Sequence, residues 1–170
     1  EERQTRYVLL AEAAADVAFD EEEAPLYAGK DGRRRTLAAM LGVAVLESGL
    51  QRDVDIGPCH RGKDLRGQDH HKRCDSGHSA CVMQVKVGRD GRTQDGLGVL
   101  DLFADRRACF REGLRRMRRS INYCADLPRL DQLAAYAKGH CGGNEGPAKS
   151  RERLGLGERL LVTVEWSTVD

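Results

Sequence analysis

The sequence has few aromatic residues, few prolines and no long apolar run. Aromatic residues make up 5% of the 170 residues, and there are 4 prolines. The longest apolar stretches, LAAMLGVAVL and LLAEAAADVAF, are shorter than the roughly 20 residues that a membrane-spanning helix needs. Neither sign of charge is in excess, since 28 lysines and arginines balance 27 aspartates and glutamates. These absences argue against a membrane span and against attraction to nucleic acid by overall charge.

The residues that are present are those of an ordinary folded domain. Hydrophobic residues make up 40% of the chain and charged residues 32%, which is far from the composition of disordered proteins. A chain of this length buries roughly two-thirds of its unfolded surface in one core. We therefore expect residues 1–170 to form a single domain. The first residues, EERQTRY, lack the basic start and apolar stretch of a signal peptide.

The apolar period predicts a mainly α fold with a small β element. A helix over residues 3–19 is expected to bury one face, which carries Tyr7, Leu10, Ala14, Val17 and Ala18. A second helix is expected from about Arg34 to Ser48, where Gly49 stops it.

The later part of the chain is predicted to hold a long loop, a hairpin turn and three more helices. Residues 59–79 show no period and predict the loop, and RDGR at 89–92 marks the turn. Asp101 is expected to be the N-cap of one helix over 101–124. Pro128 and Pro147 open the last two predicted helices. The buried stripe of the 101–124 helix is predicted to be Phe103, Phe110, Leu114, Met117 and Ile121.

The six cysteines allow two interpretations. They are Cys59, Cys74, Cys81, Cys109, Cys124 and Cys141. Three disulfides would indicate an oxidising compartment. Alternatively, the cysteines and histidines of CHRGKDLRGQDHHKRCDSGHSAC would bind zinc, but this segment lacks the C-x₂₋₄-C spacing typical of structural zinc sites. We therefore favour disulfides.

The pairing of the cysteines follows only in part from geometry. Six cysteines allow 15 connectivities. Cys109 and Cys124 cannot pair within one helix, because a rise of 1.5 Å per residue separates them by about 22 Å. We favour three pairs, namely Cys59 with Cys74, Cys124 with Cys141 and Cys81 with Cys109.

A cluster of arginines lies between residues 106 and 119. Clustered arginines on a helix are typical of a nucleic-acid surface. No aromatic residues alternate with them to stack on bases, so we expect a solvated helix face instead. The arginines are Arg106, Arg107, Arg111, Arg115, Arg116, Arg118 and Arg119.

Glu47 interrupts the apolar run VAVLESGLQRDVDIG. Its neighbours on the helix face are Ala44, Val43, Met40 and Thr36, so its carboxyl group is expected to lose contact with water. Burial and the C-terminal end of a helix both raise the pKa of a carboxyl group and favour its use as a general acid. The alternative is a buried glutamate paired with an arginine, and the residues alone do not separate the two.

Three short segments resemble the motifs of soluble lytic transglycosylases and goose-type lysozymes. They are Glu47-Ser48-Gly49, Ala80-Cys81-Val82-Met83-Gln84-Val85 and Ala135-Tyr136. In that superfamily a Glu-Ser pair ends the catalytic helix, a G-L-M-Q segment lines the cleft and A-Y-N supplies a tyrosine that faces the glutamate. The resemblance covers roughly residues 36–140. It implies a lysozyme-like fold, with a long disulfide-tied loop.

The resemblance also implies roles for individual residues. Glu47 would be the catalytic acid, and Ser48, Met83, Gln84 and Tyr136 would contact the sugar or shape its cleft. Two positions depart from the family pattern. Cys81 and Val82 replace glycine and leucine, and Ala137 replaces the asparagine after the tyrosine.

Asp75 bears on the type of reaction. Nine residues before the family glutamine, goose-type lysozymes carry an aspartate and lytic transglycosylases often carry serine; counted back from Gln84, this position is Asp75. An inverting hydrolase needs a second carboxylate to activate water. The resemblance therefore favours hydrolysis slightly. Other carboxylates in the same region, which include Asp53, Asp55, Asp64 and Asp69, leave the second carboxylate open.

The sequence and the resemblance together predict an exported muramidase. Its substrate would be the β-1,4 bond between N-acetylmuramic acid and N-acetylglucosamine in peptidoglycan glycan strands. We expect no cofactor, no metal, no nucleic-acid partner, a monomer, and an extracellular or periplasmic location. The alternative is a non-catalytic module on the same scaffold that binds cell wall or protein.

Overall fold

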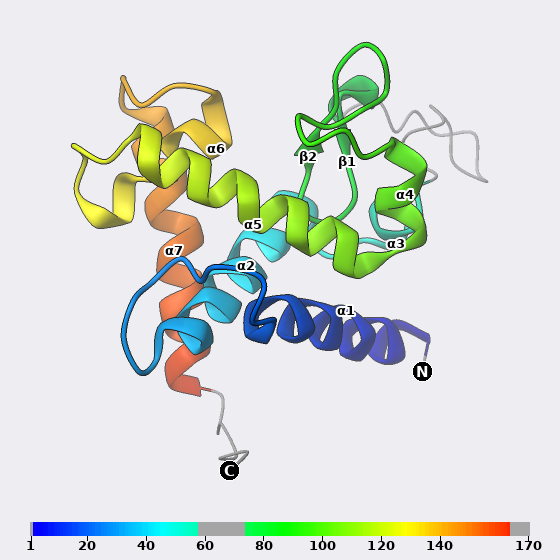
Figure 1. Ribbon diagram of the computed structural model, residues 1–170, viewed down its shortest axis with the longest axis horizontal. Helices are drawn as coiled ribbons and strands as arrows, with labels where there is room; N and C mark the ends of the chain where they lie inside the picture. Colours follow the sequence, from blue (N-terminus) through cyan, green and yellow to red (C-terminus); the bar gives the residue numbers. More distant parts are fainter. Residues whose placement is uncertain (1, 58–73, 164–170) are drawn as a thin grey trace.

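The computed structural model describes residues 2–57 and 74–163, which form a mainly helical fold with a small two-stranded sheet (Figure 1). The helices are α1 (Glu2–Phe19), α2 (Gly32–Ser48), α3 (Arg52–Asp55), α4 (Val99–Ala104), α5 (Arg106–Tyr123), α6 (Ala134–Lys138) and α7 (Glu145–Thr163). The 3₁₀ turns are η2 (Asp75–Gly77) and η3 (Arg129–Asp131), and the strands are β1 (Ser79–Ala80) and β2 (Val85–Lys86). The predicted fold class is confirmed.

The first two helices form where the apolar period predicts them. α1 buries Leu10, Ala14, Val17 and Ala18 of its expected face and packs against α2 and α5. α2 ends at Ser48, because Gly49 adopts a left-handed conformation with φ 58° and donates its N–H to the carbonyl of Val45.

α2 and α7 cross at two glycines, where their backbones approach closely. A Cβ atom on Gly42 would lie 2.5 Å from the carbonyl oxygen of Arg153, and one on Gly157 would lie 2.8 Å from the carbonyl oxygen of Ala38. Glycine is therefore required at both positions for the two backbones to meet. Figure 1 shows α7 passing across α2 on the side of the molecule opposite the hairpin.

The β element is an antiparallel pair, in which Ser79 is opposite Lys86 and Ala80 is opposite Val85. The tight turn between the strands holds Cys81–Gln84, and Gln84 donates its N–H to the carbonyl of Cys81. The predicted turn at 89–92 is present, with a hydrogen bond from Gly91 to Gly88.

The single helix predicted for residues 101–124 is wrong, because two helices occupy this stretch. Asp101 lies inside α4, where its carboxylate accepts a hydrogen bond from the N–H of Gly98. The N-cap of the long helix is Asp105, which accepts a hydrogen bond from the N–H of Arg107 at 2.8 Å. Aspartate is a preferred N-cap residue, so both positions are good candidates, and the sequence does not show which one begins the longer helix. Of the predicted stripe, Phe110, Leu114 and Met117 are fully buried, and Phe103 and Ile121 are partly buried.

The last two predicted helices are present with different beginnings. After Pro128 the chain forms η3 and then the five-residue α6, so the expected helix is broken. α7 begins two residues before Pro147, and its described part ends at Thr163.

Two of the three predicted disulfides are confirmed. Cys81 is bonded to Cys109, and Cys124 to Cys141. The third predicted pair joins Cys74 to Cys59, and Cys59 lies outside the described residues. None of the described helices has the length and apolar character needed to cross a membrane.

Candidate functional site

Glu47 lies in the last turn of α2 and forms an ion pair with Arg153 of α7. Its Oε1 atom accepts hydrogen bonds from Nη2 of Arg153 at 2.6 Å and from Nε at 2.8 Å. The two side chains are 18% and 8% exposed. The structure thus shows the paired, largely buried glutamate that the sequence analysis weighed as an alternative. The predicted apolar neighbours are also in place, since Met40, Val43 and Ala44 are fully buried.

The helix crossing explains why these two residues meet. Arg153 lies one turn before Gly157 on α7, and Glu47 lies a little more than one turn after Gly42 on α2. Because both glycines lie at the crossing, the side chains that flank it face one another. Arg153 was missed by sequence reasoning. A signal existed, because Ser150, Arg153 and Gly157 follow the i, i+3, i+7 spacing of one helix face.

Tyr136 of α6 lies beside the same site and is buried. Its hydroxyl group donates a hydrogen bond to the backbone carbonyl of Met83. Burial is the main cause that raises the pKa of Tyr136 above its ordinary value; Arg116 and Arg153 oppose the rise, whereas the negative charge of Glu47 adds to it. The segments 80–85 and 135–136 therefore touch through this hydrogen bond. Glu47, in the third segment, is close enough for its charge to act on Tyr136.

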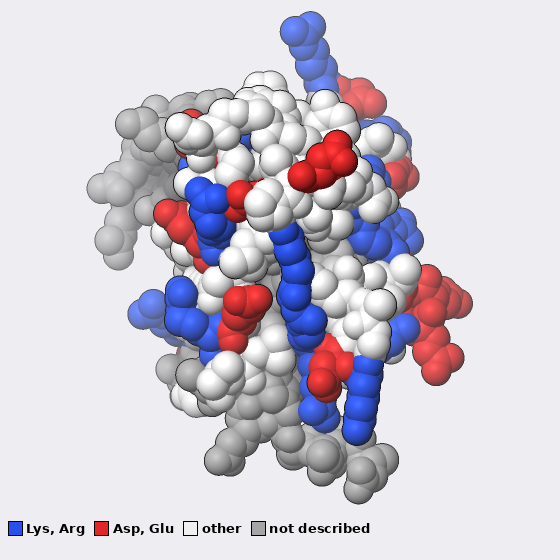
Figure 2. Space-filling model, turned by 90° about the vertical axis from the view of Figure 1, so that its left-hand side faces the viewer, with Lys and Arg blue, Asp and Glu red and all other residues white. Residues whose placement is uncertain are grey.

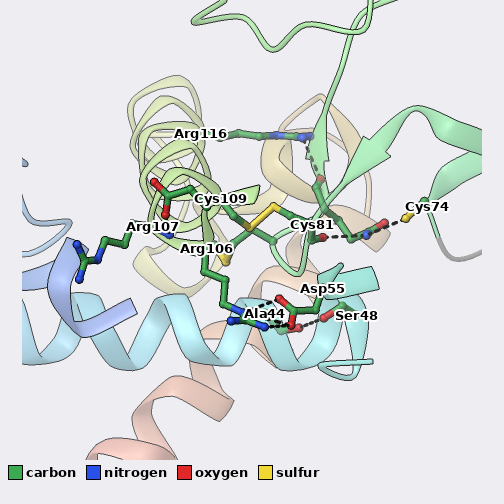
Figure 3. The surroundings of a disulfide bond; sticks show 12 residues. Ala44, Ser48, Asp55, Cys74, Cys81, Arg106, Arg107, Cys109 and Arg116 are labelled. Atoms are coloured by element: carbon green, nitrogen blue, oxygen red, sulfur yellow. Dashed lines mark hydrogen bonds and ion pairs between the residues drawn. A yellow bond between two sulfur atoms is a disulfide. The ribbon is translucent and has the colours of Figure 1, made fainter. Parts of the chain in front are cut away.

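Arg116 of α5 joins two of these segments. Its guanidinium group lies over the ring of Tyr136, 4.8 Å from the centroid, and donates to the carbonyl of Tyr136 at 3.0 Å. It also approaches the carbonyl of Gln84 at 3.4 Å (Figure 3). The sequence analysis placed Arg116 on a solvated face, which is wrong. It lies instead on the buried face that Cys109, Gly113 and Ser120 define at helical spacing.

The turn that contains Met83 and Gln84 is joined to α5 by the Cys81–Cys109 disulfide. Figure 3 shows this bond fixing the turn to α5. Met83 is fully buried against Gly113, where an added Cβ would lie 2.6 Å from its terminal methyl carbon. The side-chain amide of Gln84 donates to the carbonyl of Cys81 at 3.1 Å. Met83 is thus a core residue, and of the pair only Gln84 keeps partial exposure.

Ser48 is buried and has a role in ending α2. Its hydroxyl group donates to the carbonyl of Ala44 at 2.7 Å and accepts from the N–H of Leu50 at 3.1 Å (Figure 3 draws the first of these). These two bonds fix the backbone next to Glu47. The predicted contact between Ser48 and substrate stays a prediction.

Asp75 begins η2 and is exposed. In the part of the chain that the structure describes, it forms no hydrogen bond or ion pair with another predicted site residue. The residue before it, Cys74, has its sulfur atom 3.9 Å from the side-chain nitrogen of Gln84. Asp75 therefore adjoins the Gln84 side of the site, and its role in activating water stays a prediction.

One of the competing carboxylates has a structural role. Asp55 is buried and is held by Arg106, whose Nη2 lies 2.6 Å from Oδ2 and whose Nε lies 3.0 Å from Oδ1 (Figure 3). This pair fastens α3 to the start of α5. Asp64 and Asp69 lie outside the described residues.

Left-handed backbone conformations cluster around the site. Four non-glycine residues of the described chain have positive φ, and they are Leu50, Asp75, Cys81 and Gln84. Each lies within three residues of, or is itself, a residue that the resemblance assigned to the site. Such conformations are costly for residues with a Cβ atom and occur often at functional sites.

The arginines of α5 mostly form ion pairs and keep part of their side chains exposed, so the predicted solvated face is only partly right. The carboxylate of Glu23 is buried and forms ion pairs with Arg111, Arg115 and Arg118. Arg107 pairs with Asp16 near the surface. On the face shown in Figure 2, basic and acidic side chains are interspersed rather than gathered by sign. These observations do not favour a nucleic-acid surface on α5.

Two carboxyl groups, Asp95 before α4 and Glu112 of α5, share Arg119, and the sequence analysis did not identify this cluster. Arg119 bridges Asp95 at 3.0 Å and Glu112 at 3.2 Å. The other oxygen of Glu112 is buried and has no hydrogen-bond partner in the described structure. Burial and the neighbouring charge of Asp95 raise the pKa of Glu112.

Within the described residues, no group of three or more histidine, cysteine, aspartate or glutamate side chains could hold a metal ion. The zinc alternative depends mainly on Cys59, His60, His70 and His71, which lie outside the described residues. No protein-family model, curated protein or solved structure matches the chain.

Proposed function

We propose that the chain is a lysozyme-like muramidase, which cleaves the β-1,4 bond between N-acetylmuramic acid and N-acetylglucosamine in peptidoglycan. Glu47 is the general acid. The observation that carries this proposal is the contact of Tyr136 with the Met83–Gln84 turn, together with Glu47 near enough for its charge to act on Tyr136, although the three segments are distant in sequence. Their order and residue types are those of the superfamily that the sequence resembles.

The chemistry needs a proton donor at Glu47. The protonated carboxyl group gives its proton to the glycosidic oxygen as the bond to the sugar carbon breaks, and the bonding electron pair stays on that oxygen. In hydrolysis, water then adds to the sugar carbon and gives up a proton to Asp75. In transglycosylation, the 6-hydroxyl group of the same sugar adds instead, and the Glu47 carboxylate accepts its proton.

The products distinguish these two reactions. Purified peptidoglycan is digested with the protein, and the fragments are analysed by mass spectrometry. Hydrolysis yields fragments that end in reducing N-acetylmuramic acid, and transglycosylation yields 1,6-anhydro ends that are one water lighter. We expect hydrolysis, for which Asp75→Asn lowers the rate severely. Anhydro ends together with a mild effect of Asp75→Asn would assign the reaction to transglycosylation.

Glu47→Gln is the variant that tests the acid. It keeps the shape of the side chain and an acceptor for Arg153, so the variant remains folded. We expect cleavage to fall by about 10²–10⁴-fold, the range that general acid catalysis contributes. Substantial activity in a folded Glu47→Gln protein contradicts the assignment.

The Glu47–Arg153 ion pair favours a second candidate, a module that binds cell wall without cleaving it. An arginine partner stabilises the ionised form of a carboxyl group, whereas a general acid must carry a proton. Sedimentation with insoluble peptidoglycan separates the candidates. Binding without release of any fragment would establish the non-catalytic module.

The two disulfides of the described chain fit an oxidising compartment. We propose an extracellular or periplasmic location, where peptidoglycan is accessible. The protein is proposed to act as a monomer without a cofactor.

A further inference from the structure

We propose that Arg153 is a positioning residue, which holds the Glu47 carboxyl group through Oε1 and leaves Oε2 as the oxygen that carries the catalytic proton. This inference rests on the proposed function of Glu47 as the general acid. It gives a role in catalysis to a contact that otherwise argues against catalysis.

The geometry of the contact distinguishes the two carboxyl oxygens. Both hydrogen bonds from Arg153 end on Oε1, at 2.6 and 2.8 Å. No described residue donates to Oε2. A protonated carboxyl group has one oxygen that accepts and one that carries the hydrogen. Because an arginine donates only, the proton of a neutral Glu47 must lie on Oε2.

Arg153 is itself held firmly. Its Nη1 atom donates to the carbonyl of Lys149 at 2.8 Å, and its side chain is 8% exposed. Its backbone lies at the crossing of α2 and α7, where its carbonyl oxygen packs against Gly42. A donor that is fixed before the reaction does not have to reorganise while charge develops.

This arrangement acts on the transition state. As the proton leaves Oε2, negative charge develops on the carboxyl group and its attraction to Arg153 increases. An interaction that strengthens in the transition state raises kcat and changes KM little. A merely structural ion pair would affect stability and leave kcat unchanged in the folded protein.

The experiment compares Arg153→Met and Arg153→Lys with a matched control, Arg151→Met. Arg151 lies on the same helix and forms an ion pair with Asp131 at 2.7 Å, away from Glu47. Cleavage of purified peptidoglycan gives kcat and KM for each protein, and circular dichroism checks that each is folded. We expect Arg153→Met to lower kcat by about 10²-fold, the loss typical of one preorganised donor, with KM little changed. Arg153→Lys should recover part of the loss, because it keeps the charge but not the paired donors. Arg151→Met should retain the kcat of the unmutated protein.

The outcomes separate this inference from the proposed function. A folded Arg153→Met protein with unchanged kcat overturns the positioning role of Arg153, while Glu47 remains the acid. The positioning role is also overturned if Arg151→Met lowers kcat as much as Arg153→Met does. If Arg153→Met does not fold, the Arg153→Lys protein decides. A kcat of Arg153→Lys equal to that of the unmutated protein overturns the role, and a lowered kcat with unchanged KM supports it. Failure of the unmutated protein to cleave peptidoglycan, while Glu47→Gln is equally inert, overturns both.

Discussion

The crossing of α2 and α7 predicts opposite effects for two glycine substitutions on the same helix. Gly157→Ala would place a Cβ atom 2.8 Å from the carbonyl oxygen of Ala38 and 3.0 Å from the Cα atom of Ala39. Both are backbone atoms, so the helices must separate to relieve the contact. Gly155→Ala is the matched control, because its nearest neighbour would be a side-chain nitrogen of Arg159 at 3.8 Å.

The magnitudes follow from two opposing contributions. Replacing a helical glycine with alanine stabilises a helix by about 0.8–1.0 kcal/mol. Forcing an additional methyl group into a close-packed contact costs about 1–3 kcal/mol. Only the first contribution applies to Gly155→Ala, which should raise Tm by about 2–4 °C for a chain of this size. Both apply to Gly157→Ala, for which we expect a net loss of up to about 2 kcal/mol and a Tm below that of Gly155→Ala.

Thermal unfolding followed by circular dichroism measures both variants under one set of conditions. A Gly157→Ala protein that is as stable as Gly155→Ala would refute the close helix crossing. It would also remove the reason why Arg153 lies against Glu47. If Gly157→Ala is destabilised as expected, a parallel loss of peptidoglycan cleavage would link the crossing to the site.

Three further predictions concern other parts of the molecule. Replacing Cys81 and Cys109 together with alanine should lower the free energy of unfolding by about 3–4 kcal/mol in urea titrations, because the disulfide closes a loop between residues 28 apart; no change would contradict the stabilising role of this bond. Tyr136→Phe removes the donor to a buried carbonyl and should cost about 1–3 kcal/mol at pH 7. Because the folded protein has the higher tyrosine pKa, the stability that the neutral hydroxyl contributes is present below pH 10 and is lost as pH rises above it. The deficit of the Phe variant should therefore shrink above pH 10, and a deficit that is constant with pH would contradict it. Burial raises the pKa of Glu112, so the neutral Glu112 carboxyl group stabilises the folded protein below the unfolded pKa, and this stability is lost as pH rises. Glu112→Gln should thus be more stable than the unmutated protein at pH 7, with a gap that closes toward pH 4, and an equal or lower Tm at pH 7 would count against this.

The sequence by itself was sufficient for part of the local structure of this protein. The apolar period predicts α1 and α2, and Gly49 predicts the end of α2, because these features depend on residues within one or two turns. The two described disulfides also agree with the predicted pairs. The beginning of α5 could not be predicted, since Asp101 and Asp105 are both good capping residues and packing decides between them.

The tertiary structure alone decided the surroundings of the candidate site. Glu47 and Arg153 are separated by 106 positions in the chain. Their contact depends on two helices that approach so closely that only glycine, which has no Cβ atom, fits where they cross. In the same way, Arg116 belongs to a run of arginines, and only the packing of α5 against α6 places its guanidinium group over the ring of Tyr136. Helical periodicity determines which residues share a face, because it is a property of one segment. Which face another segment covers is a property of the whole fold, and for Glu47 that property determines whether its carboxyl group meets water, a sugar or an arginine.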